Sequence, residues 1–305
     1  MAALMLFGTA CDTVAPVDES RLVVEGYLTS GGPLSTVQVR RTVSPNGPYD
    51  PARAAVDDAT VELFIGGSTI SFAPDSKEKG TYRPGSTGET MVAAGQSFSF
   101  RAAWRGTVAE ASGIVPPTVK LGEVDVTVPD EPISAVLLDS LVLSDSIATG
   151  LYTGYIYPIE VAISWNDTTV QGWSPESSWI RAQIRPFSAF SSPVIDLFLR
   201  SDEIFREAEQ MTIDGKRRWT GLYAVGVRNE DDPLPLHRVR ISIVRSSSDY
   251  ARFAASKDAP ERREPVTNLS GAVGIFAAIA VDSVDVYVEP DGSSSIASHP
   301  REVVR

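Results

Sequence analysis

LVVEGYLTSGGPLSTVQVRRT, at residues 22–42, carries the pattern that decides the fold. Residues 22–28 are rich in β-branched and aromatic side chains, which favour strands. The SGGP sequence that follows is a turn signal. Residues 36–42 then alternate apolar and polar side chains, which is the period of a half-buried strand. The stretch therefore predicts two β-strands with a turn between them.

Similar short segments follow as far as residue 112, with glycine-containing turns between them. They lie at residues 59–65, 69–72, 81–84, 97–104 and 107–112. The stretch 44–52 is dense in proline, glycine and asparagine, which is typical of a loop. Short strands at this spacing predict an antiparallel β-sandwich. We assign the sandwich to residues 22–117, because Pro116 and Pro117 close the unit.

The rest of the chain predicts a second, larger β-rich domain at residues 118–290. Its β-type segments lie at residues 120–128, 136–143, 155–165, 179–187, 194–200, 219–227 and 236–245. Pro158 and Pro186 indicate edges or bulges, because proline cannot donate to a strand ladder. The predicted fold class is therefore all-β, with an N-terminal sandwich and a larger C-terminal β-domain.

Two short helices are expected within the second domain. Residues 202–211 carry acidic side chains in the first turn and place Ile204, Ala208 and Met211 on one helical face. Residues 248–256 begin at a serine that suits a helix N-cap. The serine-rich tail, residues 291–305, is predicted to be disordered.

The N-terminal stretch MAALMLFGTAC, residues 1–11, is too short to span a bilayer and fits the apolar region of a secretory signal. It leads through Gly8, Thr9 and Ala10 into Cys11, the only cysteine, as in a bacterial lipobox. Gly8 stands where leucine is usual, and no Lys or Arg precedes the run. We expect lipidation at Cys11, with 1–21 serving as signal and tether; the alternative is a buried strand with an inert cysteine.

The charge of the chain limits the classes of partner. Its 305 residues carry a formal net charge of -12, which argues against a nucleic-acid partner and against electrostatic docking on anionic lipid. Beyond residue 11 no apolar run approaches the length needed to span a membrane. The expected membrane contact is therefore the N-terminal lipid alone.

The residue types needed for catalysis or metal binding are sparse. The two histidines, His237 and His299, have no metal-ligand spacing, and neither a GxSxG elbow nor a phosphate-binding glycine loop occurs. The carboxylates at residues 230–232 lack the spacing of a calcium loop. We therefore expect no enzyme, no metal site and no cofactor.

Three tryptophans lie close together in the sequence, and two interpretations stay open for them. Trp165, Trp173 and Trp179 surround the polar loop 166–178. Trp173 and Trp179 could bind a ligand or partner through exposed rings. We favour the other interpretation, in which Trp165 and Trp179 are core residues and Trp173 folds the loop back over them.

The last folded stretch, EPVTNLSGAVGIFAAIAVDSVDVYV at residues 264–288, predicts a closing loop followed by a final strand. Asn268 and Gly271 suit a turn that needs positive φ. Gly274 suits a close approach between backbones.

This stretch, together with VVEGYLTSGGP at residues 23–33, resembles a family of Bacteroidota-type outer-membrane lipoproteins, the domain of unknown function 4249 family. The matching motif residues are Pro265, Val266, Asn268, Gly271, Gly274 and Phe276. Ala272 and Ala277 stand where the family usually has glycine.

The resemblance implies an immunoglobulin-like or transthyretin-like N-terminal domain, an outer-membrane location on the periplasmic or cell-surface face, and genes beside TonB-dependent receptors. We therefore expect a lipid-anchored accessory or binding protein that partners such a receptor β-barrel in nutrient uptake. The alternative is a structural or adhesive surface lipoprotein; a hydrolase with a hidden site is the third hypothesis.

Overall fold

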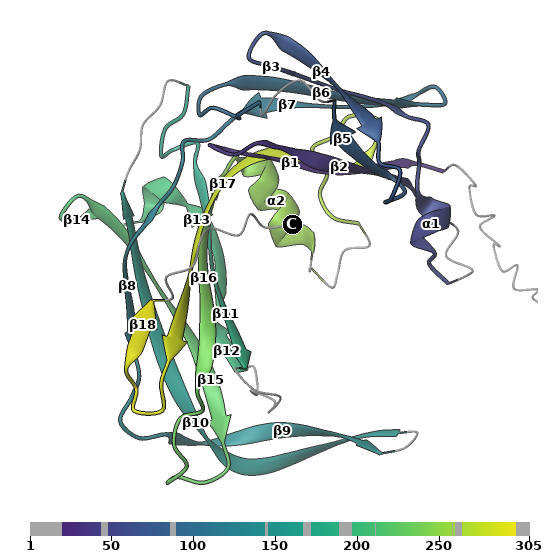
Figure 1. Ribbon diagram of the computed structural model, residues 1–305. Coiled ribbons are helices and arrows are strands. Elements are labelled where there is room, and N and C mark those ends of the chain that lie inside the picture. Colours follow the sequence, from purple (N-terminus) through teal and green to yellow (C-terminus); the bar gives the residue numbers. More distant parts are fainter. Residues whose placement is uncertain are drawn as a thin grey trace, which may run out of the picture.

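A computed structural model describes residues 20–43, 48–85, 90–143, 146–166, 172–188, 197–210, 212–257, 259 and 264–296, with only the backbone described at 137–152, 188 and 197–198. The described chain is built from two large β-sheets, which confirms the predicted all-β class. Two lobes stand at an angle and give the molecule the outline of a letter C (Figure 1).

The first lobe is a β-sandwich-like structure made from the N-terminal part of the chain. It holds β1 (Leu22–Thr29), β2 (Leu34–Arg41), α1 (Pro51–Ala54), β3 (Thr60–Ile65), β4 (Ser68–Pro74), β5 (Thr81–Pro84), β6 (Ser97–Trp104) and β7 (Thr107–Ile114). The two strands predicted within residues 22–42 are β1 and β2, and they pair in antiparallel fashion as a hairpin.

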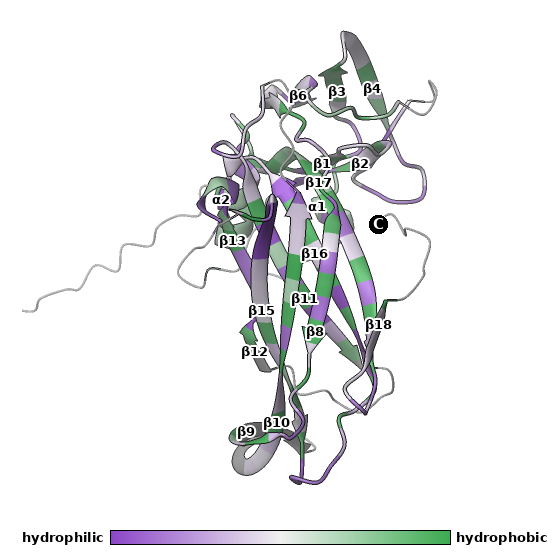
Figure 2. Ribbon diagram, turned by 90° about the vertical axis from the view of Figure 1, so that its left-hand side faces the viewer, coloured by the Kyte–Doolittle hydropathy of each residue, from purple (hydrophilic) through white to green (hydrophobic). Residues whose placement is uncertain are grey.

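The second lobe packs two sheets face to face. It holds β8 (Leu121–Thr127), β9 (Ile133–Leu143), β10 (Ser146–Asn166), β11 (Trp179–Ser188), β12 (Leu197–Arg200), β13 (Asp202–Arg206), η1 (Glu207–Glu209), β14 (Thr212–Ile213), β15 (Lys216–Val227), β16 (His237–Ser246) and β18 (Ser294–Ile296). Hydrophobic and hydrophilic residues alternate in bands along its strands (Figure 2). This alternation buries one face of each sheet in a common core, with the other face outside.

One strand joins the two lobes. The larger sheet runs β13-β11-β16-β17-β1-β2-β5-β4-β3-β6-β7, where β17 is Val273–Val288 and also carries β18. The smaller sheet runs β12-β15-β10-β8, with β9 and β14 attached. The shared strand is β17 (Val273–Val288): its first half pairs in parallel with β1, and its second half pairs in antiparallel fashion with β16. Phe276 lies in the first core and Val286 in the second. The division of the chain after residue 117 stays a prediction.

The loop before β17 closes the first lobe through two glycines. Gly271 has φ of +73°, and a Cβ there would lie 2.2 Å from the carbonyl oxygen of Val108 on β7. Gly274 has φ of +105°, and a Cβ there would lie 2.1 Å from the carbonyl oxygen of Val24 on β1. The predicted turn glycine and the predicted close approach are both confirmed.

Asn268 holds this loop by its side chain. Its Oδ1 accepts from the backbone N–H of Phe276 at 3.0 Å, and its Nδ2 donates to the Phe276 carbonyl oxygen at 2.8 Å. The prediction of positive φ at Asn268 is wrong, since the non-glycine residues with positive φ in the described chain are Arg105 and Asp214. The two hydrogen bonds of the Asn268 side chain hold the backbone of Phe276, whose ring lies parallel to that of Phe100 with centroids 3.9 Å apart.

A buried ion pair fixes the second lobe near its junction with the first. The side chains of Arg245 and Glu207 are 0% and 3% exposed, and Arg245 Nε donates to Glu207 Oε2 at 2.9 Å. Trp165 Nε1 donates to Glu207 Oε1 at 2.9 Å, and Arg245 Nη1 donates to the carbonyl oxygen of Thr118 at 2.9 Å. The pair therefore ties β16, β10 and the connection between the lobes to one carboxylate.

One of the two predicted helices is wrong and the other is confirmed. Residues 202–206 form strand β13, which pairs with β11, and a single 3₁₀ turn follows at 207–209. Strand pairing and the burial of Glu207 against Arg245 override the helical spacing of the apolar residues. The helix expected at 248–256 is α2 (Ser248–Lys257).

Two other stretches differ from the sequence-based expectation. The loop expected at 44–52 contains the start of α1, where Asp50 accepts from the backbone N–H of Ala52 at 2.9 Å as an N-cap. In the tail expected to be disordered, residues 294–296 form β18 and pair with β17. The predicted lipidation site, Cys11, lies outside the described residues. None of the helices in the described ranges has the length and apolar character needed to cross a bilayer.

We expect Gly274→Ala to destabilise the protein by about 3 kcal/mol or more, because the added Cβ collides with main chain and the backbone has positive φ. Gly67→Ala is the matched control: Gly67 has φ of +80°, but a Cβ there meets no atom within 4 Å. It should cost about 1–2 kcal/mol. Chemical denaturation measures both, and equal losses would show that the close approach is unimportant.

Glu207→Gln should cost about 3–5 kcal/mol, because it leaves the Arg245 charge buried without a counter-charge. The control is Glu264→Gln, whose partner Arg21 is 51% exposed; this loss should stay below about 1 kcal/mol. The comparison is made by urea unfolding. A loss at Glu207 as small as that at Glu264 would contradict the structural role of the buried pair.

Candidate functional site

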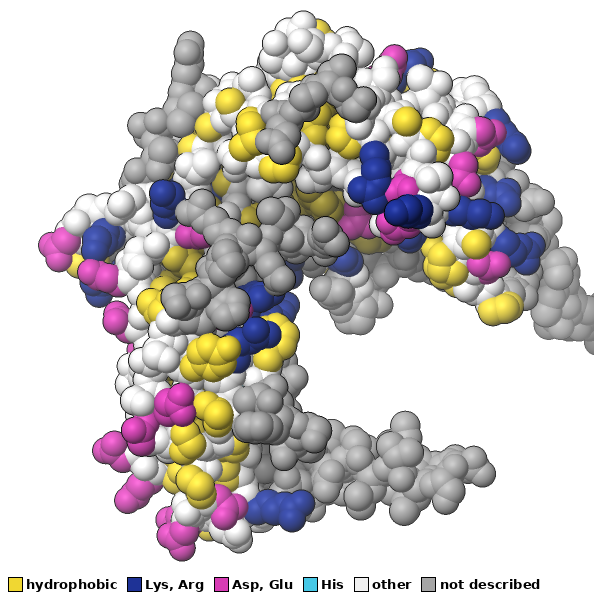
Figure 3. Space-filling view, viewed as in Figure 1, with side chains coloured by type: hydrophobic (Ala, Val, Ile, Leu, Met, Phe, Trp, Pro, Cys, Tyr) yellow, Lys and Arg dark blue, Asp and Glu magenta, His cyan; other side chains and the backbone are white. Residues whose placement is uncertain are grey.

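The concave side of the molecule is the face of β11, β16 and β17 on which α2 packs, and it looks into the space between the lobes. Helix α2 lies in this space and packs on β17, β11 and β16 (Figure 1). Its Phe253 meets Ile275 and Ala277 of β17. Because side chains alternate along a strand, Asp285 of β17 shares this face with them. The space-filling view shows the hollow between the lobes, with Lys and Arg side chains at its inner edge (Figure 3).

Four arginines gather on this concave side, and we call them the arginine face. They are Arg181 and Arg185 on β11 and Arg238 and Arg240 on β16. Strand register places Arg185 directly opposite Arg240, and Phe187 directly opposite Arg238. The face is therefore a compact block of cationic side chains with an aromatic ring beside it.

Asp202 of β13 accepts hydrogen bonds at one end of the arginine face. Arg181 donates through Nε at 3.0 Å and through Nη2 at 2.6 Å, and Gln183 donates at 2.9 Å. Arg185 approaches the same carboxylate only at 3.4 Å. Burial opposes the charge of Asp202, but the donors from Arg181 and Gln183 outweigh it and lower the pKa of the carboxyl group.

Asp285 of β17 takes the same role at the other end. Arg240 donates to it through Nε at 2.8 Å and through Nη2 at 3.0 Å, while Arg238 lies 3.5 Å away. The guanidinium carbons of Arg238 and Arg240 also lie 5.0 and 5.9 Å from the Phe187 ring centroid. Each aspartate thus has one bidentate arginine and one more distant arginine.

Two tyrosines border the arginine face beside α2. The rings of Tyr27 on β1 and Tyr250 on α2 pack edge to face, with centroids 6.1 Å apart. Burial, together with the neighbouring Glu25, raises the pKa of Tyr27, so its hydroxyl stays protonated. Burial opposes the charge of Arg181, but Asp202 and, to a smaller extent, the Tyr250 hydroxyl outweigh it and raise the pKa of Arg181, which keeps its charge.

The tryptophans lie apart from the arginine face or at its end, and two of the three are largely covered. Trp165 is fully buried in the second core, and Trp173 is 8% exposed. Among the described residues, the buried Trp173 Nε1 has no hydrogen-bond partner. Trp179 is half-buried, and Arg206 lies over its ring at 5.5 Å. The burial of Trp173 fits the interpretation in which it folds the loop inward; a binding role for Trp173 and Trp179 stays a prediction.

His237 is fully buried at the start of β16. Its Nδ1 lies 2.7 Å from the carbonyl oxygen of Pro235, which can only accept, so Nδ1 carries the hydrogen. Nε2 of the neutral ring then accepts from the Tyr223 hydroxyl at 2.8 Å. Burial lowers the pKa of His237 despite the opposing carbonyl. Nε2 therefore links the start of β16 to β15, and Nδ1 links it to the loop that precedes β16.

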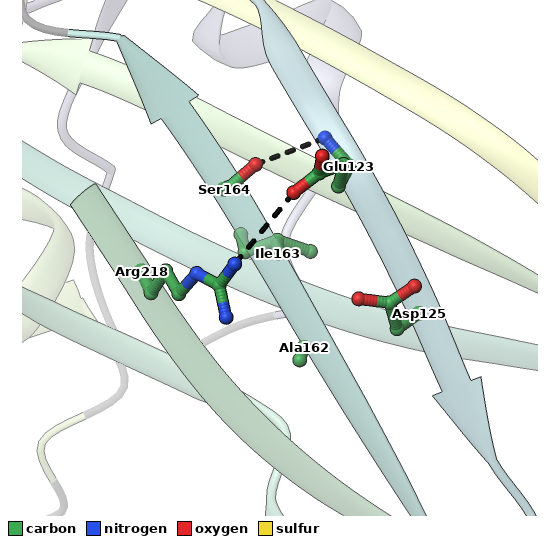
Figure 4. A pocket seen from close by; sticks show the side chains of 6 residues that line it. All are labelled: Glu123, Asp125, Ala162, Ile163, Ser164 and Arg218. Atoms are coloured by element: carbon green, nitrogen blue, oxygen red, sulfur yellow. Dashed lines mark hydrogen bonds and ion pairs between the residues drawn. The ribbon is translucent and has the colours of Figure 1, made fainter. Parts of the chain in front are cut away.

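A shallow hollow lies on the outer face of the smaller sheet, and Figure 4 shows the side chains that line it. Its lining residues are Glu123, Asp125, Ala162, Ile163, Ser164 and Arg218. Glu123 lies 2.9 Å from Lys216 and 3.7 Å from Arg218, and its backbone N–H donates to Ser164 Oγ at 2.9 Å. These contacts form a cross-strand ladder on an open sheet surface.

The acidic run at 230–232 is part of a turn. The Asp232 carboxylate accepts from the backbone N–H groups of Arg228 and Asn229 at 3.1 and 2.9 Å. Among the described residues, no group of three or more His, Cys, Asp or Glu side chains is placed to hold a metal ion.

The stability of the protein should fall as the pH decreases below about 6.5, the ordinary pKa of histidine. Below that pH the histidine binds a proton in the unfolded state but stays neutral when it is buried in the folded state. The free energy of unfolding therefore falls by up to about 1.4 kcal/mol per pH unit. His237→Asn should remove this component, and urea midpoints at about pH 5 and 7.5 measure it. The same pH dependence in both proteins would contradict the buried neutral ring.

Comparisons with known proteins identify a family for nearly the whole chain. The family model described as Domain of unknown function (DUF4249) matches residues 11–285. No curated protein and no solved structure matches the chain. Since the match covers most of the 305 residues, the chain belongs to the domain of unknown function 4249 family.

Proposed function

We propose that the protein is a lipid-anchored binding protein of the outer membrane, without enzymatic activity, that partners a TonB-dependent receptor β-barrel in nutrient uptake. The lipobox-like sequence ending at Cys11 supports the anchor. The genes that accompany this family support the receptor as partner. A structural or adhesive surface lipoprotein is the competing function.

The observation that carries the proposal is the open form of the molecule. It offers a concave face and a long projecting hairpin, both of which suit contact with a large partner. The hairpin is formed by β9 and the first part of β10, and it extends from the second lobe (Figure 1). In the described chain, residues 146–154 of β10 pair with β9 and with no other strand.

The base of this hairpin exposes apolar side chains. Ile133 is 52% exposed and Val136 is 67% exposed. A two-stranded hairpin is at best marginally stable in water by itself. Contact with another protein would cover apolar surface of this kind and stabilise the hairpin.

The proposal is tested by solubilising the native membranes in detergent and capturing the protein with its partners. We expect an N-terminus acylated at Cys11 and recovery with a TonB-dependent β-barrel. A variant that lacks the projecting hairpin is compared with the unchanged protein. In it, Asn-Gly replaces residues 136–153 and joins the paired residues Ala135 and Gly154. It should lose the receptor but keep the acyl group and the unfolding midpoint.

Phe64→Ser is the control for surface change, because Phe64 is 48% exposed on the first lobe, away from the hairpin. It should retain the receptor. An unacylated protein that starts upstream of Cys11 would overturn the anchor. An acylated protein recovered alone would favour the structural or adhesive function. Receptor binding by the shortened variant would place the contact elsewhere on the molecule.

A further inference from the structure

The arginine face carries more positive charge than its own carboxylates neutralise. Four guanidinium groups share the two carboxylates of Asp202 and Asp285, so these six side chains leave two positive charges. The whole chain has a net charge of -12. These six side chains are therefore locally positive in an otherwise acidic protein.

The surplus lies on Arg185 and Arg238. Their distances to the shared aspartates are 3.4 and 3.5 Å, whereas Arg181 and Arg240 make two shorter bonds each to the same carboxylates. The side chains of Arg185 and Arg238 are 44% and 36% exposed. Both guanidinium groups therefore have hydrogen-bond donors available to an incoming anion.

The register of the sheet concentrates this charge. Arg185 lies directly opposite Arg240, and like charges in directly opposed positions destabilise a sheet. A carboxylate bound between them would relieve the repulsion and form charge-assisted bonds in the fork geometry that arginine favours. The arrangement is thus more favourable with an anion present than without one.

We propose that the arginine face binds an extended acidic segment of a partner protein. Arg238 and Arg240 are two residues apart on β16, so their side chains repeat at about 7 Å along the strand. Carboxylates at every second residue of an extended peptide have the same repeat. Phe187, which is 40% exposed, offers an apolar surface for a side chain of the same segment.

The shape of the molecule favours a peptide over a lipid surface. The arginine face lies on the concave side, flanked by the first lobe and by the β9–β10 hairpin (Figure 1). A flat bilayer would meet the two flanks before it reached the face. The charge of -12 also disfavours anionic membranes and nucleic acid as partners of the whole protein. A single extended chain meets neither obstacle.

The test uses the purified full chain and a fluorescein-labelled peptide with aspartate at every second position. Fluorescence anisotropy at low salt should show binding that weakens as salt is added. Arg185→Gln and Arg238→Gln should each weaken binding about tenfold. Arg101→Gln is the matched control, because Arg101 is 47% exposed and forms a similar cross-strand pair with Glu110 on the first lobe; it should not change binding.

Several outcomes would overturn the proposal. Absence of binding at low salt would do so, as would equal weakening by Arg101→Gln. Equal affinity for a peptide with its aspartates in one block would overturn the match to the strand repeat. Stronger binding to vesicles that contain anionic lipid, or to inorganic phosphate, would replace the peptide with another anion. The membrane anchor and the receptor do not enter this test, so its result is independent of the proposed function.

Discussion

The close contact between the backbones of Gly274 and Val24 is the constraint on which the rest of the structure depends. Only a residue without Cβ fits where β17 comes alongside β1, because the space is taken by a main-chain oxygen that cannot rotate away. The parallel pairing that follows places Phe276 in the first core. The same strand then continues into the second lobe beside β16. The turn at Gly274 therefore closes the first core and also sets the direction in which β17 enters the second lobe.

The orientation of the lobes follows from contacts made around this strand. On one side, Arg245 binds Glu207 and the Thr118 carbonyl, so the connection between the lobes is held by a buried charge pair. On the other side, α2 covers Ile275 and Ala277. Buried ion pairs contribute little net stability compared with apolar residues, but they tolerate few alternative arrangements. We infer that this pair serves mainly to specify one geometry at the junction between the lobes.

The sequence predicts the elements that depend on local residue patterns. It fails for the elements that depend on pairing between strands distant in the sequence. Alternation and turn residues predicted β1 and β2, and the glycine in the closing loop predicted the close approach at Gly274. The helix predicted at 202–211 was wrong, because pairing with β11 and the buried carboxylate of Glu207 outweigh local spacing. The arginine face was missed. Arg185 and Arg240 are neighbours only through strand pairing, although alternating arginines in both segments were a visible signal.

The placement of polar groups also indicates where function can reside. His237 and Glu207 are the kinds of residue that catalysis uses, but each is buried and engaged with partners inside the second lobe. Arg185 and Arg238, by contrast, keep hydrogen-bond donors available and lie on an open face. An open face of this kind suits an extended partner that binds along its length. The acidic segment proposed as partner would meet these charges at the fixed repeat of the strands.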